Sequence, residues 1–278
     1  MSGKVQPAAG AVAALVPEGS TVAIGGMHLQ NNPMALALEI VRQGRHIARL
    51  ITSPSAALNA DVLIGAGLVS EIATSYVGFE HLGLAPCFRR ATESGAIRVL
   101  DLDEASITHG LYAGASGVPF AALPRGLELA DVWRENPESY RMVADPFGGE
   151  PLLVVQAIRP DVAVIHAAEA DESGTAWLAG APFTDRLMAL AARHVIVQVE
   201  RLVSSSTMSA RPIGSTIPGF LIDAVVEAPG GCRPTASHGG YPCDEDAVKE
   251  YLRMARTVDG FREWLADRVQ APAGVAGS

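Results

Sequence analysis

Cysteine is scarce in this chain, whose 278 residues include three: Cys87, Cys232 and Cys243. Their positions show neither the paired spacing of a zinc site nor the pattern of a disulfide framework. Reduced thiols are the plain interpretation. The sequence therefore predicts no metal site and a cytoplasmic protein.

Charged residues are also few, at 18% of the chain, and the formal net charge is -9. No run of lysine and arginine stands out against this acidic background. A nucleic-acid-binding domain shows a clustered basic patch. The composition therefore argues against a nucleic-acid partner.

Long apolar runs are missing as well. The first residues, MSGKVQPAAGAVAALVPEG, contain one lysine and a weak apolar stretch broken by Pro17. This is a poor match to a secretory signal peptide. No apolar run reaches the roughly 20 residues that a membrane-spanning helix needs. We expect a soluble protein with no membrane partner.

Hydrophobic residues make up 49% of the chain and gather in short runs. Several runs are continuous rather than alternating, which favours strands buried on both faces. The runs of strand length cover 21–26, 48–53, 62–67, 96–100, 151–158, 162–168, 194–200 and 223–229. The helix-like stretches between them cover 33–44, 80–95, 184–193 and 245–269. This alternation predicts an α/β fold with a largely parallel sheet sandwiched by helices.

The chain shows no composition break that would mark a linker between two domains. We interpret residues 1–270 as one domain. Its polar, proline- and glycine-punctuated segment 124–150 is interpreted as a functional excursion. The tail 271–278, APAGVAGS, is expected to be disordered.

The stretch VAIGGMHLQNNP, 22–33, places Gly25 and Gly26 between a strand and a helix start. Asn32 is expected to cap that helix and Pro33 to stand in its first turn. Glycines let the backbone approach a ligand closely, and a helix N-terminus favours negative charge. One interpretation is therefore a site for an anion or a developing oxyanion. The other is simply a tight strand-to-helix turn.

Acidic residues follow the strand in VLDLDEASITHG, 99–110, where Asp101, Asp103 and Glu104 lie close together. Ligands of α/β sheets bind where parallel strands end, and a partly desolvated glutamate there could act as base or nucleophile. The alternative is a solvated acidic helix start, which the helix dipole favours anyway.

Two further segments carry weaker signals. His166 in IHAAEADESGTAW, 165–177, is interpreted as a hydrogen-bonded core histidine followed by a turn at Gly174. Segment 226–252 is an irregular loop rich in glycine and proline, and we expect such a loop to position residues of a binding site. Asp244 is expected to cap the last helix. No G-x-S-x-G elbow supports a serine hydrolase.

Taken together, these segments resemble the α subunit of family I CoA-transferases, in particular the A chain of the glutaconate CoA-transferase type. The resemblance implies an α/β sandwich around a mixed sheet, paired with a similar β subunit. The matching segments are VAIGGM with NNP, ESGAIRVLDLDEAS, IHAAEADESGTAW, VERLV and IPGFLIDAVVEAPGGCRPTASHGGYPCDED.

The resemblance also implies a mechanism in which a glutamate takes the acyl group and then CoA. In two-chain members this glutamate belongs to the β subunit, and here Ser70-Glu71 lacks the usual serine-glutamate-asparagine-glycine continuation. On this basis a coenzyme A thioester and carboxylic acids are the substrates, and no cofactor is permanently bound. Gly25, Gly26 and Met27 are expected to line the thioester pocket, and Thr52 and Ser53 to contact the acyl carboxylate.

Two other functions stay open. A related branch of the superfamily opens a steroid-derived ring attached to CoA, and Glu104 matches the catalytic candidate of its α-like chain. The second is a non-catalytic ligand-binding domain of the same fold, which also resembles sugar-phosphate isomerases. Binding alone would leave Glu104 and the Pro229-Gly230-Gly231 loop without a role.

Overall fold

A nine-stranded sheet forms the centre of the protein in the computed structural model, which describes residues 3–270. Its strands are β1 (Ser20–Ile24), β2 (Ile47–Thr52), β4 (Val69–Thr74), β6 (Arg98–Asp101), β10 (Val162–Ala170), β11 (Ala176–Trp177), β12 (His194–Leu202), β13 (Thr216–Ile217) and β14 (Ala224–Glu227). Strands β6, β4, β2, β1, β10, β12 and β14 run parallel in this order. The short strand β11 pairs antiparallel with the end of β10, and β13 pairs antiparallel with β11. The predicted mixed, largely parallel sheet is confirmed.

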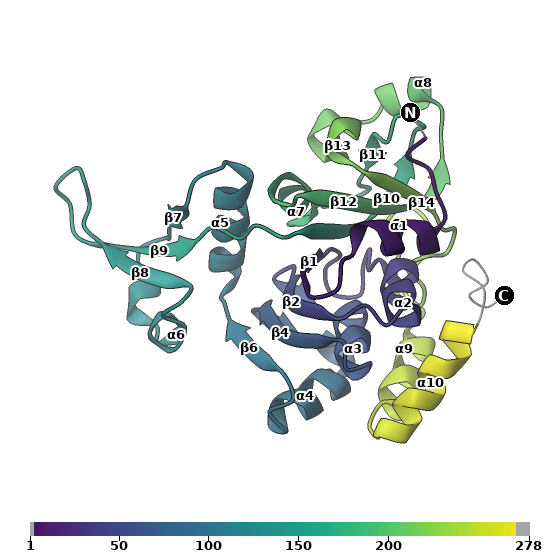
Figure 1. The fold of residues 1–278 in the computed structure, drawn as a ribbon, viewed down its shortest axis with the longest axis horizontal. Coiled ribbons are helices and arrows are strands. Elements are labelled where there is room, and N and C mark those ends of the chain that lie inside the picture. The colour runs from purple at the N-terminus through teal and green to yellow at the C-terminus, as the bar shows by residue number, and fades with distance from the viewer. Residues whose placement is uncertain (1–2, 271–278) are drawn as a thin grey trace.

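Helices cover both faces of this sheet (Figure 1). The first face carries α1 (Ala8–Leu15), α2 (Met34–Arg42), α3 (Leu58–Gly65), α4 (Pro86–Glu93), α9 (Glu245–Met254) and α10 (Val258–Gln270), whose apolar side chains share one core. The second face carries α5 (Glu104–Ala115) and α7 (Asp185–Ala191), which belong to the other core. The short helices α6 (Val132–Glu135) and α8 (Ser205–Ser209) lie outside these layers.

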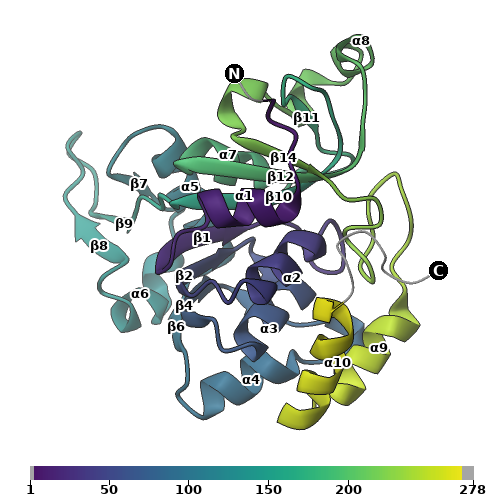
Figure 2. The same cartoon turned by 45° about the vertical axis from the view of Figure 1, so that its right-hand side comes forward.

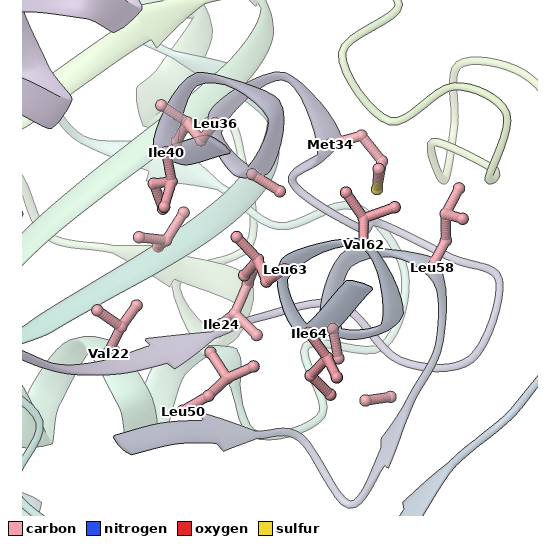
Figure 3. Close-up of a cluster of buried hydrophobic side chains, with 14 of the residues drawn as sticks. Val22, Ile24, Met34, Leu36, Ile40, Leu50, Leu58, Val62, Leu63 and Ile64 are labelled. Atoms are coloured by element: carbon pink, nitrogen blue, oxygen red, sulfur yellow. The ribbon is translucent and has the colours of Figure 1, made fainter. Parts of the chain in front are cut away.

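The prediction of a strand over 62–67 is wrong, because these residues belong mainly to helix α3. All residues of α3 from Leu58 to Ile64 are buried, so the helix shows no polar face that would reveal its period. A short apolar run cannot be assigned to strand or helix by periodicity alone. Figure 3 shows Leu63 and Ile64 of this helix packed near Ile24 and Leu50 of the sheet.

Two predicted helices are interrupted. Segment 80–95 holds a 3-10 turn, Glu80–Leu82, followed by α4, which begins with Pro86. Proline lacks a backbone N–H and is tolerated in the first turn of a helix but not in its interior. Segment 245–269 divides into α9 and α10, and the Asp244 carboxylate caps α9 as predicted by accepting from the Ala247 N–H.

The predicted excursion, 124–150, is part of a longer arm that projects away from the main sheet (Figures 1 and 2). The arm contains a separate three-stranded sheet in the order β7-β9-β8 and helix α6, of which only β8 and α6 lie within 124–150. These strands are β7 (Phe120–Ala122), β8 (Tyr140–Val143) and β9 (Leu152–Gln156), while β3 (Ser55–Ala56) and β5 (Tyr76–Val77) pair with each other elsewhere. The run 151–158 is therefore a strand, but outside the central sheet.

No helix within residues 3–270 is long and apolar enough to cross a membrane. The predicted disordered tail, 271–278, lies outside the described residues. The interpretation of 1–270 as one domain stays a prediction.

Candidate active site

The candidate site lies at the carboxyl ends of the parallel strands. Ile24 at the end of β1 pairs with Thr52 at the end of β2. Thr74 at the end of β4 pairs with Asp101 at the end of β6. The sheet thus brings the Gly25-Gly26 turn and the segments after β2, β4 and β6 to one edge, the position where α/β sheets bind ligands.

The peptide group between Gly25 and Gly26 is held at both of its polar ends. The Gly25 carbonyl accepts a hydrogen bond from the Asn59 side-chain amide at 2.8 Å. The Gly26 N–H donates to the Asp185 carboxylate, with 3.1 Å between Gly26 N and Asp185 Oδ1. The Gly26 carbonyl accepts from the Ser53 hydroxyl. The turn is therefore a fixed part of the structure, clamped by residues from three other segments.

The glycines are required for steric reasons. A Cβ on Gly25 would lie 2.8 Å from Asp185 Oδ1. Gly26 has a φ of +84°, and a Cβ there would lie 2.6 Å from the Asn31 carbonyl oxygen. Real Cβ atoms do not approach other atoms this closely, and positive φ favours glycine. Both glycines of the sequence pattern are thus explained by close packing.

The expectation that the start of helix α2 offers N–H groups to an anion is wrong. The Ala35 N–H donates to the Gly231 carbonyl at 2.9 Å, and the Leu36 N–H donates to Gln198 Oε1 at 3.1 Å. Asn32 does not cap the helix either, because its Oδ1, the atom that would accept from a helix N–H, faces the Asn59 N–H at 3.5 Å, and its Nδ2 donates to the His28 and Gln30 carbonyls. The helix start is closed by protein groups.

Thr52 and Ser53 lie beneath the turn with their side chains buried. Thr52 Oγ1 lies 2.7 Å from the Ser53 carbonyl oxygen and 2.9 Å from Thr74 Oγ1, either of which can accept its single proton, and the Ser53 hydroxyl donates to the Gly26 carbonyl. Contact with an acyl carboxylate stays a prediction. It requires the hydroxyls to leave these internal partners.

Met27 and His28 continue the turn and are partly exposed. His28 Nδ1 lies 2.6 Å from Glu80 Oε1, and both His28 and Glu80 have left-handed backbone, with φ of 50° and 52°. Such conformations are rare for residues with side chains and concentrate at functional sites. The pair places an ionisable side chain beside the predicted pocket, which the sequence did not indicate.

Glu104 lies at the same edge of the sheet and is exposed, as the first residue of α5. Asp103 caps this helix by accepting from the Ser106 N–H at 3.1 Å. Because β6 is three places from β1 in the sheet, the ends of these two strands are about 14 Å apart at ordinary strand spacing. The arm reaches this point, since the Asn136 amide donates to the Asp101 carbonyl at 3.1 Å.

His166 is a buried core histidine, as the sequence suggested. The Leu36 N–H can only donate, so it binds Gln198 Oε1, and the Gln198 amide nitrogen must face His166 Nδ1, 3.2 Å away. His166 Nδ1 is then an acceptor, and Nε2 carries the proton and donates to Ser237 Oγ at 3.0 Å. Burial lowers the pKa of His166 to about 3.

This proton position disfavours a metal at the adjacent cluster of His166, Glu200 and Cys232, whose ligand atoms lie within 4.8 Å of one another. A metal-bound nitrogen must be free of its proton, and here Nε2 holds one while Nδ1 faces Gln198. Burial raises the pKa of the Cys232 thiol well above its usual range. Glu200 is occupied by the Tyr241 hydroxyl and the Gly230 N–H.

Comparison with known proteins decides the family. Residues 5–228 match coenzyme A transferase, which is four fifths of the chain. The chain belongs to the coenzyme A transferase family. The resemblance drawn from the sequence is confirmed.

Several relatives of the chain are A subunits of CoA-transferases. The chain is 35% identical to the A subunit of 3-oxoadipate CoA-transferase from Pseudomonas knackmussii, covering 94% of this chain and 91% of that protein. It is 31% identical to the cholesterol ring-cleaving hydrolase IpdA subunit of Rhodococcus jostii, covering 89% and 86%. An uncharacterised Archaeoglobus fulgidus protein is 34% identical over 95% of this chain, which spans 59% of that protein's length.

Solved structures confirm the CoA-transferase fold. Glutaconate coenzyme A-transferase of Acidaminococcus fermentans superposes with a TM-score of 0.87 at 29% identity, covering 96% of this chain and 88% of that one. A variant of the decarboxylase AibA/AibB superposes with a TM-score of 0.83 at 32% identity, covering 95% and 99%. The same architecture therefore accompanies more than one named reaction.

Asp185 and Asn59 are two further residues of the candidate site that the sequence pattern did not reveal. The sequence placed Asp185 only within the helix-like stretch 184–193. In the structure burial raises the pKa of the Asp185 carboxyl to about 7, although the hydrogen bond from Gly26 works in the opposite direction. Both residues reach the turn from distant parts of the chain, so no local spacing could connect them to it.

Proposed function

We propose that this chain is the A-type (α) component of a CoA-transferase that moves CoA between carboxylic acids, together with a β subunit that supplies the acyl-accepting glutamate. The observation that carries this is its 35% identity to the A subunit of a CoA-transferase over 94% of its length. The chain's own Ser70-Glu71 pair cannot serve instead. Glu71 lies within β4 and forms ion pairs with Arg49 and Arg98.

The chemistry proceeds in balanced steps. The partner glutamate attacks the acyl-CoA carbonyl and releases CoA thiolate, which leaves a mixed anhydride. The thiolate then attacks the glutamyl carbonyl, releasing the first acid and leaving a glutamyl-CoA thioester. The acceptor acid reverses both steps. A carboxylate becomes an effective nucleophile when it is held out of water beside groups that stabilise the developing charge.

This chain's part is to frame the cavity in which those steps occur. Gly25 and Gly26 form a stretch of wall without side chains at the sheet edge, and Met27 continues it. Thr52 and Ser53 support this wall, because Ser53 holds the Gly26 carbonyl and Thr52 contacts Ser53. No resident cofactor is needed in this scheme. The absence of a metal and a cytoplasmic location stay predictions.

The purified chain alone is expected not to exchange CoA between acids, because it lacks the acyl-accepting glutamate. Adding the partner subunit should restore exchange. The measurement is transfer of CoA from an acyl-CoA to an isotopically labelled acid, with the isolated partner chain as control. Full activity from this polypeptide without a partner would show that it is not half of a two-chain enzyme.

A ring-opening hydrolase is the alternative that a specific observation favours. Glu104 is exposed at the sheet edge beside the arm, and the chain is 31% identical to a ring-cleaving hydrolase subunit. In this alternative Glu104 acts as base or nucleophile on the ring of a CoA thioester. The non-catalytic binding domain has no comparable feature in its favour.

Borohydride trapping separates the two functions. The complex is incubated with acyl-CoA and no acceptor acid, then treated with borohydride, which reduces a glutamyl thioester to an alcohol. For the transferase we expect the reduced residue on the partner subunit in both wild type and Glu104→Gln. Absence of trapping, with activity lost in Glu104→Gln, would support the hydrolase.

A further inference from the structure

Asp185 is a buried acid directly beside the Gly25-Gly26 turn. Its side chain is 3% exposed, and its two carboxylate oxygens lie 3.1 and 3.4 Å from the Gly26 nitrogen. No ion pair with Asp185 occurs among residues 3–270. Burying an ionised carboxylate without a cation costs several kcal/mol. Such a group is a candidate for a functional role when it lies at a site.

The contact has a clear structural consequence for the turn. A peptide between two glycines rotates easily, because neither residue has a Cβ to restrict φ and ψ. Here Asp185 binds the N–H of this peptide while Asn59 binds its carbonyl oxygen at 2.8 Å. A rotated peptide would exchange the directions of N–H and C=O and so reverse the dipole at the sheet edge.

The same carboxylate also restricts the neighbouring position. A Cβ at Gly25 would lie 2.8 Å from Asp185 Oδ1 and 3.0 Å from its Cγ. The acid and the glycine therefore occupy one shared space. With Asp185 in this place, position 25 can hold only glycine.

We propose that Asp185 is a positioning residue, which holds the Gly25-Gly26 peptide in the orientation that shapes the wall of the CoA-thioester pocket. This inference rests on the proposed function, because it takes the turn to be that wall. Asp185 itself does not touch the substrate. Its carboxylate accepts the Gly26 N–H and acts on the pocket through the turn.

The test uses the complex of this chain with its partner subunit. Asp185→Ala should lower kcat for CoA transfer about 10²-fold per folded complex, as misplacement of site groups does, while KM for the acceptor acid changes little. Asp185→Asn should recover most of the rate, because its amide oxygen can accept the same N–H. Wild-type kcat in Asp185→Ala, or equal losses in both variants, would overturn the proposal.

A matched control is available on the same strand. Asp161 accepts the Thr21 N–H at 2.8 Å at the opposite end of β1. Asp161→Ala removes a carboxylate–backbone hydrogen bond from β1 away from the turn, so kcat per folded complex should stay at the wild-type value. A loss equal to that of Asp185→Ala would mean that any damage to β1 slows the enzyme, and would overturn a local role.

A second readout does not depend on transferase activity. With ¹⁵N-glycine labelling, hydrogen exchange of the Gly26 amide reports its hydrogen bond directly. Protection should be lost in Asp185→Ala and restored in Asp185→Asn. If even the wild-type complex transfers no CoA, the proposed function fails, but the exchange measurement still shows whether Asp185 holds the Gly26 N–H. If the Gly26 amide stays protected in Asp185→Ala, the positioning role of Asp185 is wrong whatever the activity.

Discussion

Gly26→Ala should destabilise the protein by about 3 kcal/mol and lower CoA transfer by about 10²-fold. Gly26 has a φ of +84°, and a left-handed conformation costs a residue with a Cβ about 1–2 kcal/mol. The added Cβ would also lie 2.6 Å from the Asn31 carbonyl oxygen and 2.9 Å from Asn32 Cα. Both are backbone atoms, so the turn itself must move.

Gly44→Ala separates these two contributions. Gly44 follows helix α2 with a φ of +62°, and a Cβ there would meet nothing within 4 Å. Its substitution should therefore cost only the conformational share, about 1–2 kcal/mol, with wild-type transfer. The free energies come from urea unfolding and the rates from the assembled enzyme. Equal effects of the two substitutions would show that the turn is not closely packed.

The sequence predicted six of the seven parallel strands, most of them from apolar runs buried by helices on both faces. It missed β4, whose sequence VSEIAT alternates with polar residues and is not a continuous apolar run. It failed for residues 62–67, where an equally apolar run is a helix buried on every side. The local sequence does not distinguish a buried strand from a buried helix. Pairing with neighbouring strands decides which of the two forms, and this pairing depends on distant residues.

The candidate site likewise contains residues that the local sequence reveals and residues that only the fold reveals. Gly25 and Gly26 could be found from their own pattern, since close packing and positive φ select glycine wherever they occur. Their partners could not. Asn59, Asp185 and Ser53 lie 27 to 159 residues away from the glycines that they hold, so the contacts exist only in the folded chain. The functional meaning of Glu104 likewise came from family resemblance, because an acid at a helix start is ordinary.

Asp185→Asn should become more stable relative to wild type as the pH rises from 4 to 8, by about 2–4 kcal/mol in total. Burial raises the pKa of Asp185 from 3.8 to about 7. Between these values the folded protein holds a proton that the unfolded chain has released. The contribution of Asp185 to stability is therefore fully present below pH 4 and is lost as the pH rises towards 7. Asparagine does not titrate, so its stability lacks this slope.

The difference between wild type and variant is the quantity to measure, because another buried group acts in the opposite direction. Burial lowers the pKa of His166 from 6.5 to about 3. Its unfolded form takes up a proton below pH 6.5 that the folded form refuses, so this contribution falls as the pH falls. The His166 contribution is common to wild type and Asp185→Asn and cancels in their difference.

Asp61→Asn provides the comparison that identifies the titrating group. Burial raises the pKa of Asp61 to about 6, while hydrogen bonds from Tyr251 and from the Phe88 and Cys87 N–H groups oppose the shift. The pH-dependent difference for Asp61→Asn should therefore level off near pH 6, and that for Asp185→Asn near pH 7. Urea unfolding at half-unit steps of pH resolves the two. A difference for Asp185→Asn that is constant from pH 4 to 8 would mean that the acid beneath the glycine turn keeps an ordinary pKa. In that case burial imposes no energetic penalty on its charge.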